Sequence, residues 1–349
     1  MTIDPYVALA LQAPCWAVNL CKTPEEARQR MHETIDYCGR LIKGSKGFIR
    51  TFSGDEARLV VLPEYFLTSF PLGESVDSWI ARGCVAADGP EYEALARIAQ
   101  DNHIYLSGNL YETDPHFPEI YFQTSFILSD TGEQILRYRR LVSMFAPTPH
   151  DILDRYLDVY GADALFPVAD TPIGRLACVA SEEILYPEIT RCLALRGAEV
   201  ICHSSSEVTS PLATPKNIAK QARAYENMLY VVSANSACIH DIPFPKDSTG
   251  GGSRVVDYKG QVLAEAAGGE SMCGNAEVDI DALRRTRRRP AMTNMLARQR
   301  LDLFAPTYAE GVYPANNMLV EGDIRVPDRS HFMATQQAVI DGLVARGII

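Results

Sequence analysis

A glutamate that follows a run of apolar residues is the first candidate for acid–base chemistry. Glu64 comes directly after the segment "RLVVLP", residues 58–63. Such a run predicts a buried strand, and a carboxylate at its end is partly desolvated. Desolvation raises the pKa of a carboxyl group and makes it a usable general base. A solvated acid at a strand end is the alternative interpretation of this stretch.

Two further stretches also place polar residues at predicted strand ends. Arg139 and Arg140 alternate in "RYRRLVSMF", residues 137–145, which predicts that one points inward while the other is solvated; an exposed basic pair is the alternative. Ser181 follows the apolar segment 174–180, so its hydroxyl can face a pocket with backbone N–H groups nearby. Because its neighbours do not form a GxSxG elbow, Ser181 is either a nucleophile or only a turn residue.

The elements that must position these residues alternate between strands and helices. We expect strands at residues 6–12, 58–62, 104–111, 121–128, 133–139, 174–180, 199–202, 229–233, 253–257 and 261–264. We expect helices at residues 24–49, with Thr23 as N-cap, and at 91–102, 187–196, 217–227, 295–304 and 331–345. Because two hairpins interrupt the alternation, the pattern favours a sandwich with helical outer layers over a plain doubly wound sheet.

The composition excludes several classes of protein. A hydrophobic content of 47% in 349 residues is typical of a globular protein with a substantial core. The net charge of −11, with no offsetting basic stripe, argues against a nucleic-acid partner. The sequence opens without a signal-peptide pattern and has no apolar run of membrane-spanning length. Its nine cysteines lack CxxC pairs, which predicts a cytoplasmic protein with reduced thiols and no structural zinc.

Five ordered blocks together resemble the nitrilase (carbon–nitrogen hydrolase) superfamily. They are "VVLPEYFLTSFP", "GEQILRYRRLVSMF", "GRLACVASEEILYPEITRCLALRGAEVICHSSS", "QARAYENMLYVVSAN" and "GGSRVVDYKGQVLAEA". The resemblance covers roughly residues 5–285. It implies an α/β fold, the four-layer α-β-β-α sandwich of nitrilase type. It also implies a nitrilase-like catalytic domain at 1–285, and we expect residues 286–349 to form a C-terminal extension that packs on a partner subunit.

The resemblance also assigns the catalytic positions. The family's glutamate falls on Glu64, its lysine on Arg140 and its cysteine on Ser181. In the family the glutamate takes a proton from the thiol, the thiol attacks an amide or nitrile carbon, and the lysine stabilises the anionic intermediate. A serine hydroxyl is a far weaker acid than a thiol and depends on a well-placed base. An arginine keeps the positive charge of the lysine but cannot shuttle protons.

Further residues are candidates for substrate binding. Tyr65 and Glu182 directly follow Glu64 and Ser181, and core packing is the alternative role for Tyr65. His203 ends a predicted strand, where the resemblance implies a place in the pocket wall; a satisfied buried histidine is the alternative. These side chains are expected to contact a small molecule rather than a metal or an organic cofactor, neither of which the family chemistry needs.

Two further questions concern the replacement for the family's second glutamate and the possible use of another nucleophile. The family's second glutamate is missing from "APTPHDILDRY", residues 146–156, where Asp151 is our candidate replacement, with His150 and Asp154 as alternatives. Cys178 lies three residues before Ser181, but the strand alternation predicts that its side chain points away from the turn. We therefore do not expect it to act as a substitute nucleophile.

Three functions remain open. The first is a hydrolase or hydratase that uses Glu64, with Ser181 or an activated water, on a C–N, C≡N or ester-like bond of a small molecule. The second is a non-catalytic nitrilase-fold pseudoenzyme that binds a small molecule or a protein partner. The third is a structural role through a homodimer or larger assembly, which the resemblance implies. Complementary charges at Glu64 and Arg140 favour the first two, because a vestigial pocket has no need of them.

Overall fold

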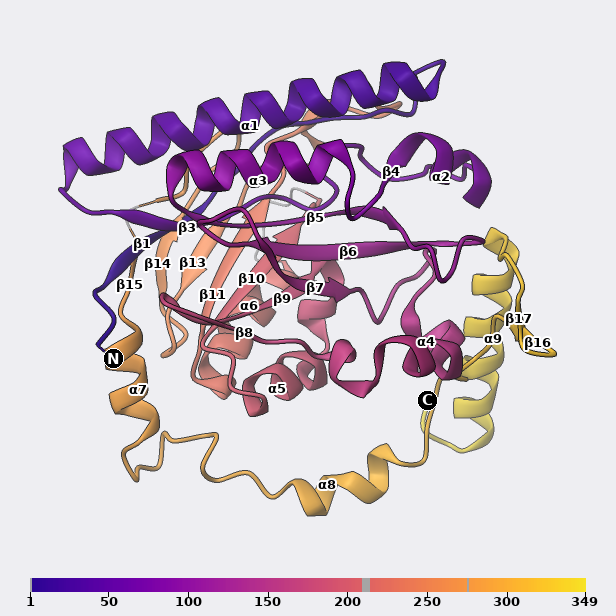
Figure 1. Cartoon of the computed structure of the whole chain (residues 1–349). Helices are drawn as coiled ribbons and strands as arrows, with labels where there is room; N and C mark the ends of the chain where they lie inside the picture. Colours follow the sequence, from indigo (N-terminus) through magenta and orange to yellow (C-terminus); the bar gives the residue numbers. More distant parts are fainter. Residues whose placement is uncertain (1, 209–213, 275) are drawn as a thin grey trace.

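Two β-sheets packed face to face, with helices on both outer sides, form the body of the protein. The structure, a computed structural model, describes all residues except 1, 209–213 and 275. Figure 1 shows α1 (Pro24–Phe52) and α3 (Pro90–Asn102) along the outside of the first sheet, and α5 (Pro187–Leu195) and α6 (Pro215–Asn227) below the second. The predicted four-layer α-β-β-α sandwich is confirmed.

The strands of both sheets lie close to their predicted positions. Within the described residues, the first sheet has the order β15–β1–β3–β5–β6–β7, with β4 beside β5. Its strands are β1 (Tyr6–Ala10), β3 (Ala57–Val61), β4 (Cys84–Val85), β5 (Tyr105–Thr113), β6 (Tyr121–Leu128), β7 (Gln134–Arg139) and β15 (Glu277–Val278). The second sheet has the order β14–β13–β11–β10–β9–β8. Its strands are β8 (Ala169–Thr171), β9 (Gly174–Ala180), β10 (Val200–Ser205), β11 (Tyr230–Asn235), β13 (Arg254–Val256) and β14 (Val262–Glu265). Both predicted hairpins, β6–β7 and β13–β14, are confirmed as antiparallel neighbours.

Strand β1 explains why both faces of the first sheet are buried. Ala8 and Ala10 belong to the core between the two sheets, whereas Val7 and Leu9 belong to the core beneath α1 and α3. Alternate side chains of a strand point to opposite faces, so a strand covered on both faces needs an uninterrupted apolar run. The apolar runs of the sequence therefore predict strands without an alternating polar pattern.

The helices follow their sequence signals, with one exception. Helix α1 begins at the predicted N-cap, where Thr23 Oγ1 accepts a hydrogen bond from Glu26 N at 3.3 Å. The helix predicted at 295–304 is wrong in its bounds, because α8 spans Leu301–Tyr308. The side chain of Asn294 bonds to backbone groups on both sides of itself, at Arg287, Arg289 and Ala297, and holds the chain before α8 in turns.

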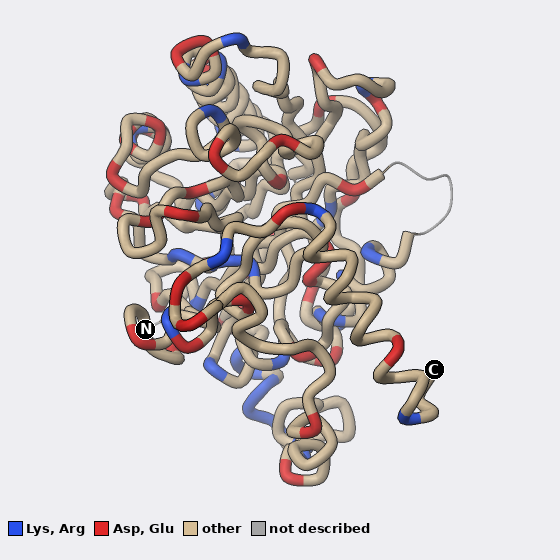
Figure 2. The backbone as a smooth tube through the Cα atoms, turned by 90° about the vertical axis from the view of Figure 1, so that its right-hand side faces the viewer, with Lys and Arg blue, Asp and Glu red and all other residues tan. Residues whose placement is uncertain are grey.

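The remaining elements are short or lie in the C-terminal part of the chain. They are α2 (Val76–Gly83), α4 (Leu153–Tyr160), α7 (Ile280–Arg287), α9 (Arg329–Ala345), the 3-10 turns η1 (Pro149–Ile152), η2 (Ala162–Leu165), η3 (Ser181–Leu185) and η4 (Lys246–Thr249), and the strand pairs β2 (Cys15–Trp16) with β12 (Ile239–His240) and β16 (Leu319–Val320) with β17 (Asp323–Ile324). In Figure 1 the chain runs from α7 below α5 to α8, and then to α9 beside α4. The described helices include none whose length and apolarity would suit a membrane span. Figure 2 shows basic and acidic positions interspersed along the backbone.

Candidate active site

The three predicted catalytic residues each follow a strand of one of the two sheets, and two of them, Glu64 and Arg140, are in contact. Strands β3 and β5 are parallel, and β7 runs in the same direction because it is separated from β5 by one antiparallel strand. Glu64 follows β3, Arg140 follows β7, and Ser181 follows β9 of the facing sheet. The fold thus brings together segments that are far apart in the sequence.

Glu64 is a buried carboxylate with well-defined hydrogen-bond donors. Its side chain is 3% exposed. Oε1 accepts from Gln123 Nε2 at 2.8 Å and from Arg140 Nη1 at 3.4 Å, and Oε2 accepts from the backbone N–H of Ser206 at 3.1 Å. A buried carboxylate needs such donors, because burial without partners is costly. These contacts fix the orientation of the carboxylate.

Arg140 is engaged along its whole guanidinium group. Nε donates to Val142 O at 2.7 Å, Nη1 donates to Gln123 Oε1 at 2.6 Å and to Glu64, and Nη2 donates to Glu182 Oε1. Burial alone would lower the pKa of this guanidinium, but the nearby carboxylates of Glu64, Glu182 and Glu183 outweigh it and raise the pKa overall. Arg140 therefore links Glu64 to the turn that carries Ser181.

Ser181 stands at the turn in a strained conformation. Its φ is +48°, in the left-handed region that residues with a Cβ rarely adopt. Its hydroxyl oxygen accepts a hydrogen bond from Lys216 Nζ at 3.1 Å, and its carbonyl lies 2.8 Å from His203 Nε2. Strain of this kind occurs at functional sites when the surroundings hold the residue in place.

Glu183, which is not among the residues predicted from the sequence, holds this turn in place. Oε2 accepts from Ala180 N at 3.2 Å and from Tyr138 Oη at 2.9 Å, while Oε1 accepts from the backbone N–H groups of Leu141 and Val142 at 2.6 and 3.1 Å. Burial raises the pKa of this carboxyl to about 7 despite these donors. Glu183 thus fastens the Ser181 turn to the segment after Arg140.

Two lysines of α6 were also missed. Lys216 contacts the Ser181 hydroxyl, and Lys220 is fully buried, with Nζ 3.0 Å from Asn217 Oδ1 and 3.7 Å from Glu207 Oε2. Burial lowers the pKa of Lys220 to about 7. The spacing of Lys216, Lys220 and Arg223 places three cations on one face of a helix, which is a signal that the sequence does contain.

The predicted substrate-binding residues lie in different settings. Glu182 is at the cluster, since it accepts from Arg140, and its side chain is 35% exposed. Tyr65 follows Glu64 and is nearly buried, with its ring stacked on Tyr111. Both ring nitrogens of His203 are engaged, by Ser181 O and by Ser233 Oγ at 2.8 Å each, and burial holds the pKa of His203 well below its usual value. His203 therefore supports the Ser181 peptide.

Asp151 binds the C-terminal segment of the chain. Oδ2 accepts from the backbone and hydroxyl of Thr148, and Oδ1 accepts from Asn317 Nδ2 at 2.7 Å. The backbone carbonyl of Asp151 accepts from Met318 N at 3.0 Å. Both carboxylate oxygens of Asp151 thus have protein partners within η1 and the C-terminal segment.

Two expectations about neighbouring side chains can be compared directly with the structure. Cys178 is fully buried, with Sγ 3.6 Å from Ser107 Oγ of the facing sheet, and burial raises the pKa of its thiol well above the usual value. Its thiol therefore faces the other sheet. The prediction that one arginine of the 139–140 pair is solvated is wrong. Arg139 is buried, lies over the ring of Phe122 and pairs with Asp114, because α4 and neighbouring aromatic residues cover it.

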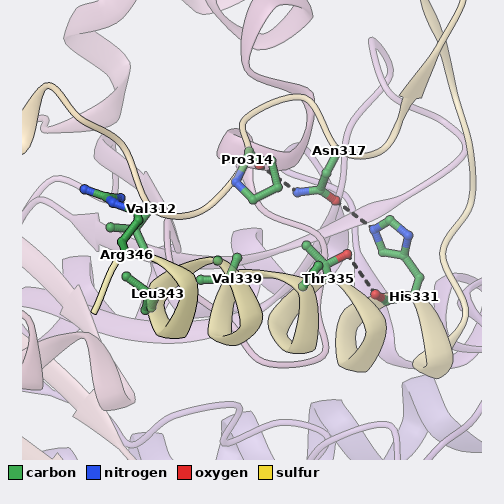
Figure 3. Close-up of a pocket in the computed structure, with 10 residues that line it drawn as sticks. Val312, Pro314, Asn317, His331, Thr335, Val339, Leu343 and Arg346 are labelled. Carbon is green, nitrogen blue, oxygen red and sulfur yellow. Dashed lines mark hydrogen bonds between the residues drawn. The ribbon is translucent and has the colours of Figure 1, made fainter. Parts of the chain in front are cut away.

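A cavity of about 410 Å³ lies apart from this cluster, in the C-terminal segment. Figure 3 shows α9 on one side, with His331 Nε2 2.7 Å from Asn317 Oδ1, and the loop carrying Val312 and Pro314 on the other. None of the predicted site residues is among the described residues that line it. In the described part of the chain, no group of three or more His, Cys, Asp or Glu side chains is placed to hold a metal ion.

Comparison with known proteins identifies the family. Residues 10–288 match the carbon-nitrogen hydrolase family, and the chain belongs to it. It is 31% identical over 232 residues to a formamidase of Bradyrhizobium diazoefficiens, which covers 66% of this chain and 62% of the relative. It is 28% identical over 270 residues to the nitrilase and fragile histidine triad fusion protein NitFhit of Caenorhabditis elegans, covering 75% of this chain and 58% of the relative.

Solved structures support the fold. A carbon-nitrogen hydrolase from Helicobacter pylori G27 superimposes with a TM-score of 0.64 at 20% identity, covering 87% of this chain and 98% of the other. Saccharomyces cerevisiae Nit3, a member of branch 10 of the nitrilase superfamily, superimposes with a TM-score of 0.62, covering 82% and 94%. At this identity the similarity establishes the nitrilase fold.

Proposed function

We propose that this protein is a nitrilase-like hydrolase or hydratase that acts on a C–N, C≡N or ester-like bond of a small molecule. Membership of the carbon-nitrogen hydrolase family supports the reaction class, and the formamidase relatives make a small amide the first substrate class to test. The observation that carries the proposal is the hydrogen-bonded chain from Glu64 through Arg140 to Glu182, which ends next to the strained Ser181.

In this proposal, Ser181 takes the place of the family's cysteine and Arg140 that of its lysine. Ser181 Oγ forms a bond to the carbonyl carbon, and the hydroxyl proton passes to Glu64. The C–N bond then breaks, and the nitrogen leaves with that proton as ammonia or an amine. Water releases the acid from the ester intermediate and restores the hydroxyl, with Glu64 again accepting and returning the proton. Arg140 balances the charges of Glu64 and Glu182, and no metal or organic cofactor takes part.

Two other uses of the same site give different outcomes in one experiment. If Glu64 activates a water molecule, Ser181 is a pocket residue. If the chain is a pseudoenzyme, Glu64, Arg140 and Ser181 form a polar site that binds a ligand without converting it. A buried carboxylate paired with a cation is compatible with a serine nucleophile, an activated water and a pseudoenzyme. Measured turnover must therefore distinguish these three uses of the site.

A mass-spectrometric turnover screen of amides, carbamoyl compounds, nitriles and esters would test the proposal. We expect wild type to convert at least one member, and Ser181→Ala and Glu64→Gln to lose about 10²–10⁴-fold in rate, as for loss of a nucleophile or general base. The exposed carboxylate of Glu277 provides a matched control, Glu277→Gln, which should keep wild-type activity. Loss in Glu64→Gln alone would indicate water as the nucleophile. Binding of a panel member without turnover would contradict the enzyme and favour the pseudoenzyme.

The expected assembly and the role of residues 286–349 stay predictions. Large apolar side chains of this segment are exposed in the single chain, including Met292 at 84% and Leu303 at 68%. Exposed apolar residues in such numbers suit a contact with another copy. Light scattering of the full chain would give the number of subunits.

A further inference from the structure

We propose that Lys216 is a catalytic residue, whose ammonium group orients the Ser181 hydroxyl and stabilises the negative charge that develops on Ser181 Oγ during attack. This inference rests on the proposed function, because it assigns a role in that reaction. It also places the cation that serves the nucleophile on α6 rather than at the end of β7, where the resemblance placed it. Lys216 contacts the reacting atom itself, at 3.1 Å.

The hydrogen bond between Lys216 and Ser181 has a fixed direction. An ammonium group has three donors and no acceptor, so Lys216 Nζ donates and Ser181 Oγ accepts. With one lone pair of Oγ held in this way, the hydroxyl hydrogen must point elsewhere, toward a base or solvent. The contact therefore prepares the hydroxyl to give up its proton in another direction.

The position of Lys216 within α6 also indicates a functional role. It lies in the first turn of α6, where the helix dipole disfavours a positive charge. The other long helices of the sandwich have acidic residues there, such as Glu25 in α1, Glu91 in α3 and Glu188 in α5. A lysine at this position does not help the helix, and departures from local rules are expected at functional sites.

Helix α6 is anchored to the turn that carries Ser181. Arg223, two turns after Lys216 on the same face, donates to Ile184 O at 3.0 Å and to Leu185 O at 2.9 Å. These carbonyls belong to the turn η3, which begins at Ser181. The helix is thus fixed to the turn that it serves, so the lysine and the hydroxyl keep their relative position.

Arg140 already donates hydrogen bonds to other groups of the protein. Its Nε, Nη1 and Nη2 atoms each donate to a protein acceptor, at Val142, Gln123 and Glu64, and Glu182. In the described part of the chain, the hydrogen bond to Ser181 Oγ comes from Lys216. During attack the hydroxyl proton moves to Glu64 and the Oγ–carbon bond forms, while Lys216 keeps its protons and remains a cation throughout.

A thiol placed at position 181 would measure the effect of Lys216 without relying on turnover. We would make Ser181→Cys with and without Lys216→Met and follow thiolate absorbance against pH. An opposite charge at this distance favours the thiolate, so the midpoint should lie roughly 1–3 pH units lower in the single variant than in the double variant. The nine native cysteines interfere little, because burial raises the pKa of each one.

Controls separate this effect from a change in total charge or in folding. Lys43→Met, which removes an exposed lysine of α1, should leave the midpoint of Ser181→Cys unchanged. Lys216→Arg should keep most of the shift because it keeps the charge. Equal midpoints with and without Lys216 in folded proteins, verified by thermal unfolding, would overturn the inference.

Kinetics provide the second measurement. With an amide that wild type converts, Lys216→Met should lower kcat by about 10²–10³-fold, the effect of removing one donor to a developing oxyanion, with a smaller change in KM. An unchanged kcat would overturn the inference even if the enzyme is active. A wild type that converts no panel member, with the midpoint difference intact, would overturn the proposed function but support the electrostatic role of Lys216.

Discussion

Arg140 and Lys216 bring positive charge to the same turn from different elements of the fold, and their surroundings differ. Arg140, which follows β7, donates hydrogen bonds to Glu64, Gln123, Glu182 and a backbone carbonyl. Lys216, on α6, is only partly buried and donates to the hydroxyl of Ser181. The difference separates two tasks: a cation that holds acidic side chains together, and a cation that faces the atom expected to react.

Removal of each cation should therefore affect different properties. Arg140→Met leaves two carboxylates without their partner, and breaking a buried ion pair lowers the free energy of unfolding by about 3–5 kcal/mol. Lys216→Met should change it by about 0.5 kcal/mol or less, as for a substitution outside the buried network. Urea unfolding at neutral pH would measure both. Similar losses in the two variants would mean that the proposed separation of tasks is wrong.

Glu183 connects the segment after Arg140 to the turn that carries Ser181. Its amide variant should show how much this connection contributes to stability. Glu183→Gln keeps the shape but replaces one acceptor oxygen by a donor, opposite groups that themselves donate. We expect the free energy of unfolding to fall by about 1–3 kcal/mol, the cost of leaving buried donors unpaired. Glu277→Gln, at an exposed position of β15, is the matched control and should have little effect. An unchanged stability of Glu183→Gln would contradict the holding role of this carboxylate.

The α6 side should also have its own dependence on pH. Lys220 has a pKa lowered to about 7 in the folded protein, by burial first and then by the charges of Arg254 and Lys216, with Glu207 opposing them. Since the usual lysine pKa is about 10.4, the unfolded chain binds more protons between these values. Stability contributed by this group therefore rises with pH across that window, by at most about 1.4 kcal/mol per pH unit, and is lost as pH falls toward 7.

Denaturant unfolding at several pH values would detect this slope. Wild type should gain stability relative to Lys220→Met between roughly pH 7 and 10, and the two curves should run parallel below that range. The titrating cysteines and tyrosines are common to both proteins, so they cancel in the difference. Parallel curves over the whole range would contradict the lowered pKa.

Local sequence signals predicted the sheets well and the site only in part. The apolar runs before Glu64 and Ser181 mark strands because both faces of each sheet are buried. The environment of Arg139 could not be read in this way, because its cover comes from α4, a separate segment of the chain. Lys216 could not be paired with Ser181, because the contact joins residues 35 positions apart and depends on how α6 packs against the turn. The predicted roles of Tyr65, Asp151, Glu182 and His203 in substrate binding await experiment.

The left-handed backbone of Ser181 has a consequence for how this protein balances stability and activity. A residue with a Cβ in this region is strained by about 1–2 kcal/mol, whereas glycine adopts the same conformation freely. Ser181→Gly would therefore relieve the strain while it removes the hydroxyl. If the hydroxyl is the nucleophile, this variant would be more stable and inactive, so stability and activity would change in opposite directions at one position.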